Sequence, residues 1–187
     1  MTGRIEKLQK EFDIEIQWVE FPLHPHIPEG GLTFDELLAG RNIDIHQMMT
    51  HLKNVAGQVN LPLNDPKRAY NTRLAQEVGK WAGAHGKGDE FHNAVFSAYF
   101  VDSKNISDPL ILIDLAESVG LSKDDARKVI ANRTSKEAVD QDWSRSREVF
   151  ISSVPTFLIN EQRLVGAQSY EVLKQFMINN KVEKKPV

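Results

Sequence analysis

The side chains of this chain that could do chemistry are histidines and carboxylates, because its 187 residues include no cysteine. Disulfide bonds, thiolate metal sites and thiol catalysis by these residues alone are therefore excluded. His24 and His26, in the stretch LHPHIP, are spaced to face one side of an extended segment and could begin a metal site. Since no third ligand lies near them in the sequence, we interpret both as loop residues and predict neither a metal nor a cofactor.

A second feature with chemical meaning is the Val154–Pro155 pair, which stands directly before the strand-like run TFLI. Proline has no backbone N–H and cannot pair fully in a sheet, so it marks the start of a strand, a sheet edge or a cis peptide bond. We therefore expect the backbone to depart from regular strand geometry at this pair, at a position that could serve the function.

Composition excludes some classes of binding partner for this protein. A formal net charge of −3, with 41% hydrophobic and 26% charged residues, is typical of a globular protein and gives no basic surface for nucleic acid. The first residues, MTGRIEKLQKEF, lack an apolar leader region, and no stretch has the length of a membrane span. We therefore expect a cytoplasmic protein with no nucleic-acid or membrane partner.

The elements that must position these residues follow from periodicity. Ile5, Leu8 and Phe12 lie on one face of a short helix, and the alternation of the next residues predicts a strand over 14–20. Capping patterns at Thr33, Asp108 and Ser122 begin helices, and Ser169 begins the last one. The expected helices between these strands are 33–40, 44–57, 68–85, 89–101, 108–119, 122–131 and 135–149.

Strand character returns at 156–159 and 163–165, which a short polar connection joins as a hairpin. A regular βαβ repeat would show several strands between residues 33 and 150. The sequence instead predicts an α/β chain of the α+β kind with a large all-helical insertion.

Four segments in order resemble those of one family. They are YNTRLAQEVGKWAGAHGK, FHNAVFSAYFVDSKNISD, LIDLAESVGLSKDDARKVI and SVPTFLINEQRLVGAQSYEVL. They are similar to the DsbA-like thioredoxin-fold family, in the FrnE-type branch of cytoplasmic dithiol–disulfide oxidoreductases and isomerases. The resemblance implies a thioredoxin-like domain over 1–32 and 134–187 and an inserted helical domain over 33–133.

The same resemblance implies roles for individual residues. The proline that matches Pro155 is cis in this family, and Val154 before it offers backbone groups to an extended substrate. Asn71 and His24 are candidates for lining the cleft. Asn71 could instead cap a helix, and we slightly favour that interpretation. The family's catalytic Cys-x-x-Cys motif has no counterpart here, so no catalytic residue is assigned.

The first strand of the family fold, which precedes that motif, is also missing from the match. In that fold the strand lies between those that correspond to 14–20 and 156–160, and its loss leaves backbone groups unpaired, at about 1–3 kcal/mol each when buried. Three hypotheses follow: the natural protein carries the strand and motif upstream of Met1, the two flanking strands pair directly, or a second chain donates a strand, as in a homodimer.

Three functions remain open. The first is the family activity, thiol–disulfide exchange on a polypeptide or a small thiol or disulfide substrate, with the cysteines outside this numbering. The second is a non-catalytic peptide- or protein-binding module that uses Val154 and Pro155. The third, which fits less well, is a relative of the glutathione-dependent 2-hydroxychromene-2-carboxylate isomerases and kappa-type transferases.

Overall fold

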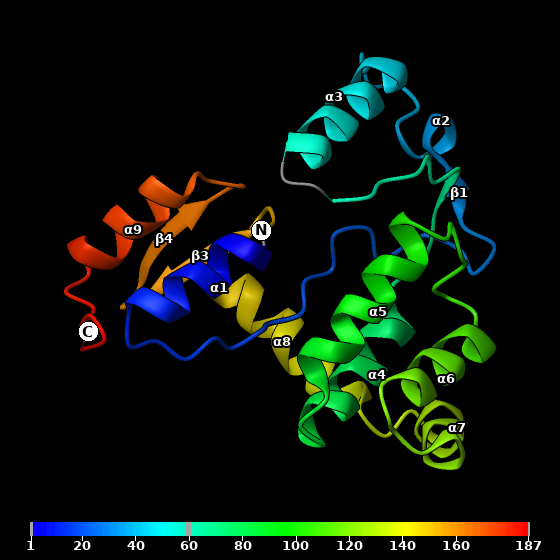
Figure 1. The fold of residues 1–187 in the computed structure, drawn as a ribbon. Helices are drawn as coiled ribbons and strands as arrows, with labels where there is room; N and C mark the ends of the chain where they lie inside the picture. Colours follow the sequence, from blue (N-terminus) through cyan, green and yellow to red (C-terminus); the bar gives the residue numbers. More distant parts are fainter. Residues whose placement is uncertain (1, 59–60, 187) are drawn as a thin grey trace. The chain divides into compact units, whose positions relative to one another are not determined.

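Helices make up most of the computed structural model, which describes residues 2–58 and 61–186 (Figure 1). In chain order the elements are α1 (Thr2–Glu11), β1 (Leu32–Thr33), α2 (Phe34–Leu37), α3 (Ile45–Gln58), β2 (Arg68–Ala69), α4 (Arg73–Ala84), α5 (Gly88–Phe100), α6 (Pro109–Ser118), α7 (Lys123–Asn132), α8 (Lys136–Glu148), β3 (Thr156–Ile159), β4 (Gln162–Val165) and α9 (Tyr170–Asn179). No helix among the described residues is long and apolar enough to cross a bilayer.

The chain divides into two compact units. One consists of Met1–Leu23 with Asp142–Val187, and the other of His24–Gln141. The boundaries expected from the sequence were 32/33 and 133/134. Residues 24–32 belong with the helical unit because Ile27 is buried in it and the Ile27 carbonyl accepts a hydrogen bond from the Asn71 side chain at 2.7 Å.

The predicted helix starts are confirmed. The Thr33 hydroxyl accepts from the Glu36 N–H while the Glu36 carboxylate accepts from the Thr33 N–H at 2.7 Å, which is a complete capping box. Asp108, Ser122 and Ser169 each accept a backbone N–H of the following turn. These local side-chain bonds satisfy donors that have no partner inside the helix.

The helical unit has its core between α4, α5, α6 and α7, which pack against one another (Figure 1). Its largest fully buried apolar side chains are Phe91, Leu112 and Val78. Burying such a side chain contributes about 1.5–3 kcal/mol. The expected helical insertion is thus present, held by its own apolar core, although it also contains the short β1–β2 pair.

The prediction of helix from residue 68 is wrong for residues 68–72, because α4 begins only at Arg73. Residues 68 and 69 instead form β2, which pairs antiparallel with β1. The Arg68 guanidinium donates to the Gly30 and Gly31 carbonyls, both at 3.0 Å, and the Arg68 carbonyl accepts from the Tyr99 hydroxyl at 2.9 Å. Gly31 has φ of +72°, and a Cβ there would meet the Ala69 carbonyl oxygen at 2.7 Å. These long-range contacts outweigh the local helical pattern.

One buried carboxylate joins three parts of the helical unit. Glu77 on α4 is 2% exposed and accepts from Arg73 at 2.6 Å and from two nitrogens of Arg133, each at 2.6 Å. Arg133 ends α7, and Arg73 also donates to the Lys136 carbonyl at the start of α8. Burial raises the pKa of Glu77, but the hydrogen bonds from Arg133 and Arg73 outweigh it and hold the pKa below 4.5.

The other unit is built on the β3–β4 hairpin, with α1 and α9 beside it (Figure 1). A buried cluster is formed by Leu8 of α1, Phe12 just after α1, and Leu173 and Met177 of α9. Phe157, Ile159 and Leu164 of the hairpin pack against it. The predicted hairpin is confirmed, with Asn160 and Glu161 as its turn at φ of +46° and +66°. Positive φ at both positions is the geometry that suits the twist of a two-residue hairpin.

The strand predicted over 14–20 is wrong. In the described part of the chain these residues are irregular and belong to neither sheet, and they do not pair with β3 as one of our hypotheses required. Ile14 still packs on the α1–α9 cluster, whereas Trp18 is 43% exposed. The alternating pattern was real, but a strand forms only where a neighbouring strand offers backbone partners.

Glu11 at the end of α1 is the charge that ties α1 to α9. Its carboxylate accepts from the Tyr170 hydroxyl at 2.5 Å and lies 2.6 Å from the Lys174 ammonium and 3.5 Å from that of Lys184. The Lys174 and Tyr170 hydrogen bonds lower the pKa of Glu11 to about 2, and the bond to Glu11 raises the pKa of Tyr170 to about 12.

Replacing the buried carboxylate, Glu77→Gln, is expected to lower the free energy of unfolding by about 3 kcal/mol, because Arg133 and Arg73 lose the buried charge that they share. Arg73 keeps its second ion pair, with Asp140 at 2.7 Å. The matched control is Glu117→Gln, whose carboxylate is 57% exposed and lies 2.9 Å from Lys123. That change should cost less than about 1 kcal/mol. Urea unfolding followed by circular dichroism measures both, and equal effects would contradict the role of Glu77.

Acid should lower the free energy of unfolding of the chain because Glu11 becomes protonated. Its pKa is lowered in the folded state, so the stability it contributes is full above pH 4.5 and is lost progressively as the pH falls to about 2. Glu11→Gln should therefore show a smaller loss of stability across that interval than the unchanged chain. Unfolding curves at several pH values measure this, with Glu15→Gln, an exposed position, as the control. Parallel pH profiles for Glu11→Gln and the unchanged chain would refute the prediction.

Candidate functional site

The Val154–Pro155 turn leads directly into β3, and its peptide bond is cis. Two hydrogen bonds hold the turn: the Thr156 hydroxyl donates to the Ser153 carbonyl at 2.7 Å, and the Gly166 N–H donates to the Pro155 carbonyl at 2.8 Å. The Val154 side chain is 45% exposed. The turn is thus fixed to the hairpin while Val154 faces outward.

One edge of β3 lacks a partner strand. β3 pairs antiparallel with β4 from Thr156↔Val165 to Ile159↔Gln162, and no strand lies along its other edge in residues 2–58 and 61–186. A free edge presents backbone N–H and C=O groups that an extended chain can pair with.

The two faces of the hairpin differ. Phe157 and Ile159 point to the α1–α9 cluster, so Leu158 between them points to the opposite face, where it is 40% exposed. Arg163, the cross-strand partner of Leu158, donates to the Val149 and Phe150 carbonyls at 2.9 and 3.1 Å. These bonds give hydrogen-bond partners to two backbone carbonyls just after α8 and connect that end of the helix to the second face of the hairpin.

The other two candidates belong to the helical unit. The Asn71 side chain donates to the Ile27 carbonyl and accepts from the Arg73 N–H at 2.9 Å, so it covers an unpaired donor at the start of α4. His24 lies in a turn in which its carbonyl accepts from the Ile27 N–H at 3.3 Å. Val154 and Pro155 lie in one unit and Asn71 and His24 in the other, and both Asn71 side-chain groups are engaged in holding local structure.

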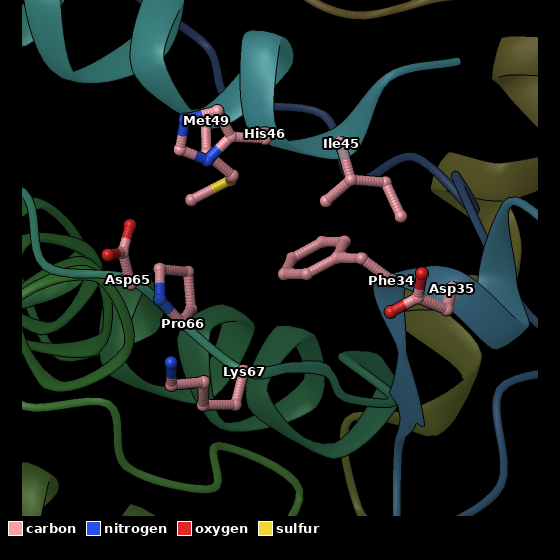
Figure 2. Close-up of a pocket in the computed structure, with 8 residues that line it drawn as sticks. All are labelled: Phe34, Asp35, Ile45, His46, Met49, Asp65, Pro66 and Lys67. Carbon is pink, nitrogen blue, oxygen red and sulfur yellow. The ribbon is translucent and has the colours of Figure 1, made fainter.

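A shallow pocket that sequence reasoning missed lies in the helical unit (Figure 2). It has a volume of about 280 Å³ and is lined by Phe34, Asp35, Ile45, His46, Met49, Asp65, Pro66 and Lys67. Lys53 donates to Asp65 at 2.7 Å and lowers its pKa. The Asp65 carboxylate is thus already paired. The pocket lining also includes a second carboxylate at Asp35, the His46 imidazole, the Lys67 ammonium and the apolar side chains.

The described residues contain no group of three or more histidine or carboxylate side chains placed to hold a metal ion. His24 and His26 accordingly have no further ligands gathered round them.

Comparison with known proteins matches this architecture. The uncharacterized protein YwbO of Bacillus subtilis is 30% identical over 184 residues, which are 96% of this chain and 88% of YwbO. The ClpXP adapter protein SpxH of the same organism is 26% identical over 131 residues, which cover 66% of this chain and 42% of SpxH.

Solved structures show the same fold. A probable DsbA oxidoreductase from Streptomyces coelicolor superposes with a TM-score of 0.87 at 22% identity, covering 100% of this chain and 85% of that one. A 2-hydroxychromene-2-carboxylate isomerase superposes with a TM-score of 0.69 at 19% identity, covering 94% and 84%. The predicted fold class, a thioredoxin-like α/β fold with a helical insertion, is confirmed.

The family model described as the DSBA-like thioredoxin domain matches residues 1–177. Those residues include α1, the β3–β4 hairpin with its Val154–Pro155 turn, the helical insertion and most of α9. This chain belongs to the DsbA-like thioredoxin-domain family.

Proposed function

We propose that this chain binds extended polypeptides at the Val154–Pro155 turn, as the substrate-binding part of a DsbA-family thiol–disulfide oxidoreductase or isomerase. The observation that carries the proposal is a turn that two hydrogen bonds hold to the hairpin while Val154 is 45% exposed. A peptide that pairs with the backbone of Val154 gains main-chain hydrogen bonds regardless of its sequence. Binding of this kind suits an enzyme that acts on many polypeptides.

The thiols of the reaction must come from outside these 187 residues, because they contain no cysteine. Thiol–disulfide exchange requires a thiolate that attacks a disulfide sulfur and forms a mixed disulfide. A serine or histidine of this chain does not replace it. The proposal therefore assigns binding and orientation of the polypeptide to this chain, and the redox step to thiols from another source.

A non-catalytic binding module is the second candidate, and the absence of cysteine favours it. SpxH, one of the relatives, is named an adapter protein, which is a binding role. Both candidates use the same surface and differ only in whether thiols act beside it. The intact mass of the protein from its own source separates them: a mass above that of these 187 residues, with a Cys-x-x-Cys motif, supports the enzyme.

The FrnE-type branch and a cytoplasmic location are part of the proposal. Their support is the order of the four sequence segments, which resemble those of that cytoplasmic branch. The likeness to 2-hydroxychromene-2-carboxylate isomerase is one of fold, at 19% identity. No residue observed at the site favours that chemistry over binding of polypeptides.

Val154→Asp is expected to weaken binding of a permanently unfolded, thiol-blocked protein, reduced and carboxamidomethylated α-lactalbumin, by about tenfold, because a charge replaces an apolar contact at the Val154–Pro155 turn. Val172→Asp is the matched control: Val172 is 41% exposed but lies in the first turn of α9, where an acidic side chain is favourable. Fluorescence anisotropy measures both affinities. An equal effect of the two variants, or no binding by the unchanged chain, would count against the proposal.

The chain of these 187 residues should not catalyse the reduction of insulin by dithiothreitol, because it has no thiolate to form a mixed disulfide. The measured turbidity should rise at the rate seen without protein. A rate clearly above that of a buffer blank would show a redox route that needs no cysteine of this chain.

A further inference from the structure

The pocket beside α3, which we call the α3 pocket, is formed by three segments of the helical unit (Figure 2). The start of α2, the first turns of α3 and residues 65–67 each contribute side chains to it. Its volume is about 280 Å³, whereas a cavity of about 150 Å³ is enough to bind benzene. The α3 pocket is therefore large enough to accept one aromatic or large aliphatic side chain.

Hydrogen bonds fix the walls of the α3 pocket. Lys53 on α3 donates to Asp65 at 2.7 Å, and the Asn64 N–H donates to the Phe100 carbonyl, at the end of α5, at 2.8 Å. The first turn of α3 is capped, because the Asp44 carboxylate accepts a backbone N–H of that turn at 2.9 Å. The pocket is thus held in shape by the protein itself, which lowers the ordering cost of binding.

The apolar lining continues along α3 beyond the pocket. Ile45, Met49 and Leu52 follow one another at i, i+4 and i+7, which places them on one face of the helix. This face lies outside the packed core of α4, α5, α6 and α7, and Leu52 is 45% exposed. A ligand that extends past the pocket would meet further apolar surface. That surface suits a polypeptide better than a small free molecule.

The charge at one end of the α3 pocket is positive. α3 contains no acidic residue, although the whole chain has a formal net charge of −3. The hydrogen bond from Lys53 lowers the pKa of Asp65, and the nearby charges of Lys67 and His46 lower it further. Of the two carboxylates in the lining, Asp65 is already paired with Lys53, and Asp35 lies at the opposite end (Figure 2). Lys67 therefore leaves a surplus positive charge at the Asp65 end.

We propose that the α3 pocket binds a polypeptide segment in which a large apolar side chain stands next to an acidic residue. The apolar side chain enters between Phe34, Ile45 and Met49, and the acidic side chain lies beside Lys67. The inference goes beyond the proposed function, because the Val154–Pro155 turn belongs to the other unit. Either surface can bind a polypeptide without the other.

A second copy of this chain is a poorer occupant of the α3 pocket. A dimer with twofold symmetry brings the same surface patch of both copies together. Two surfaces with surplus positive charge at Lys67 would then face each other, which is unfavourable. An acidic residue beside the inserted side chain matches this charge instead.

The test uses fluorescent nine-residue peptides without cysteine. The first has a central phenylalanine between glutamates, the second has serine in place of the phenylalanine, and the third has glutamine in place of the glutamates. Fluorescence anisotropy should show that the unchanged chain binds the first peptide about tenfold more tightly than the second, because the ring is removed from water. It should bind the first about fivefold more tightly than the third, and this ratio should shrink at high salt.

Two variants with matched controls locate the binding. Met49→Gln should lower affinity for the first peptide by about fivefold, through lost apolar contact, and leave that for the serine peptide unchanged. Leu110→Gln, at a 66% exposed leucine on α6, should change neither affinity. Lys67→Gln should lower affinity for the first peptide by about threefold and leave that for the glutamine peptide unchanged. Lys104→Gln, at a lysine whose side chain is 46% exposed, is its control.

The outcomes separate this inference from the proposed function. Equal binding of the phenylalanine and serine peptides, or equal affinities of Met49→Gln and Leu110→Gln, would overturn the α3 pocket. If unfolded α-lactalbumin still bound and Val154→Asp still weakened it, the proposed function would stand. Binding of the first peptide that Met49→Gln weakens and Val154→Asp does not would support the α3 pocket even if the proposed function failed. A dimer in sedimentation that Met49→Gln converts to a monomer would assign the pocket to self-association and overturn the inference.

Discussion

The carboxylate of Glu77 is the interaction on which the helical unit depends. A charge that is 2% exposed is tolerable only when it is fully paired, and here two arginines supply every contact. The partners come from the start of α4 and the end of α7, and Arg73 also reaches the first turn of α8. One buried anion thus fixes where three helices begin or end, a task that apolar packing alone does with less directional precision.

The β3–β4 hairpin follows a different rule. Its α1–α9 side is closed by apolar packing and by the Glu11 cluster, whereas Leu158 and Val165 on the second face are 40% and 51% exposed. The Val154–Pro155 turn is fixed to this hairpin by hydrogen bonds from the Thr156 hydroxyl and the Gly166 N–H. A turn that is held in place while Val154 is exposed is what supports binding of extended polypeptides.

Most helices were predictable from sequence because their signals are local. Asp108, Ser122 and Ser169 cap the turns that follow them, and Gly120 takes the positive φ of +87° expected at a helix end. The strand over 14–20 was not predictable in the same way. Alternation records which side chains face a core, and Ile14 does pack on one, but strand formation needs a partner that lies elsewhere in the chain. Residues 68 and 69 are the opposite case: the local pattern predicted a helix, but pairing with the distant strand β1 makes them a strand.

By itself, the sequence determined the absence of thiol chemistry, the helix caps, the hairpin turn and the position of Pro155 before a strand. These are properties of residue types and near neighbours. Only the tertiary structure decided that Glu77 is buried between two arginines, that Asn71 is engaged with Ile27, and that α2, α3 and residues 65–67 line one pocket. Such facts depend on which distant groups meet, and neither spacing nor periodicity along the chain carries that information.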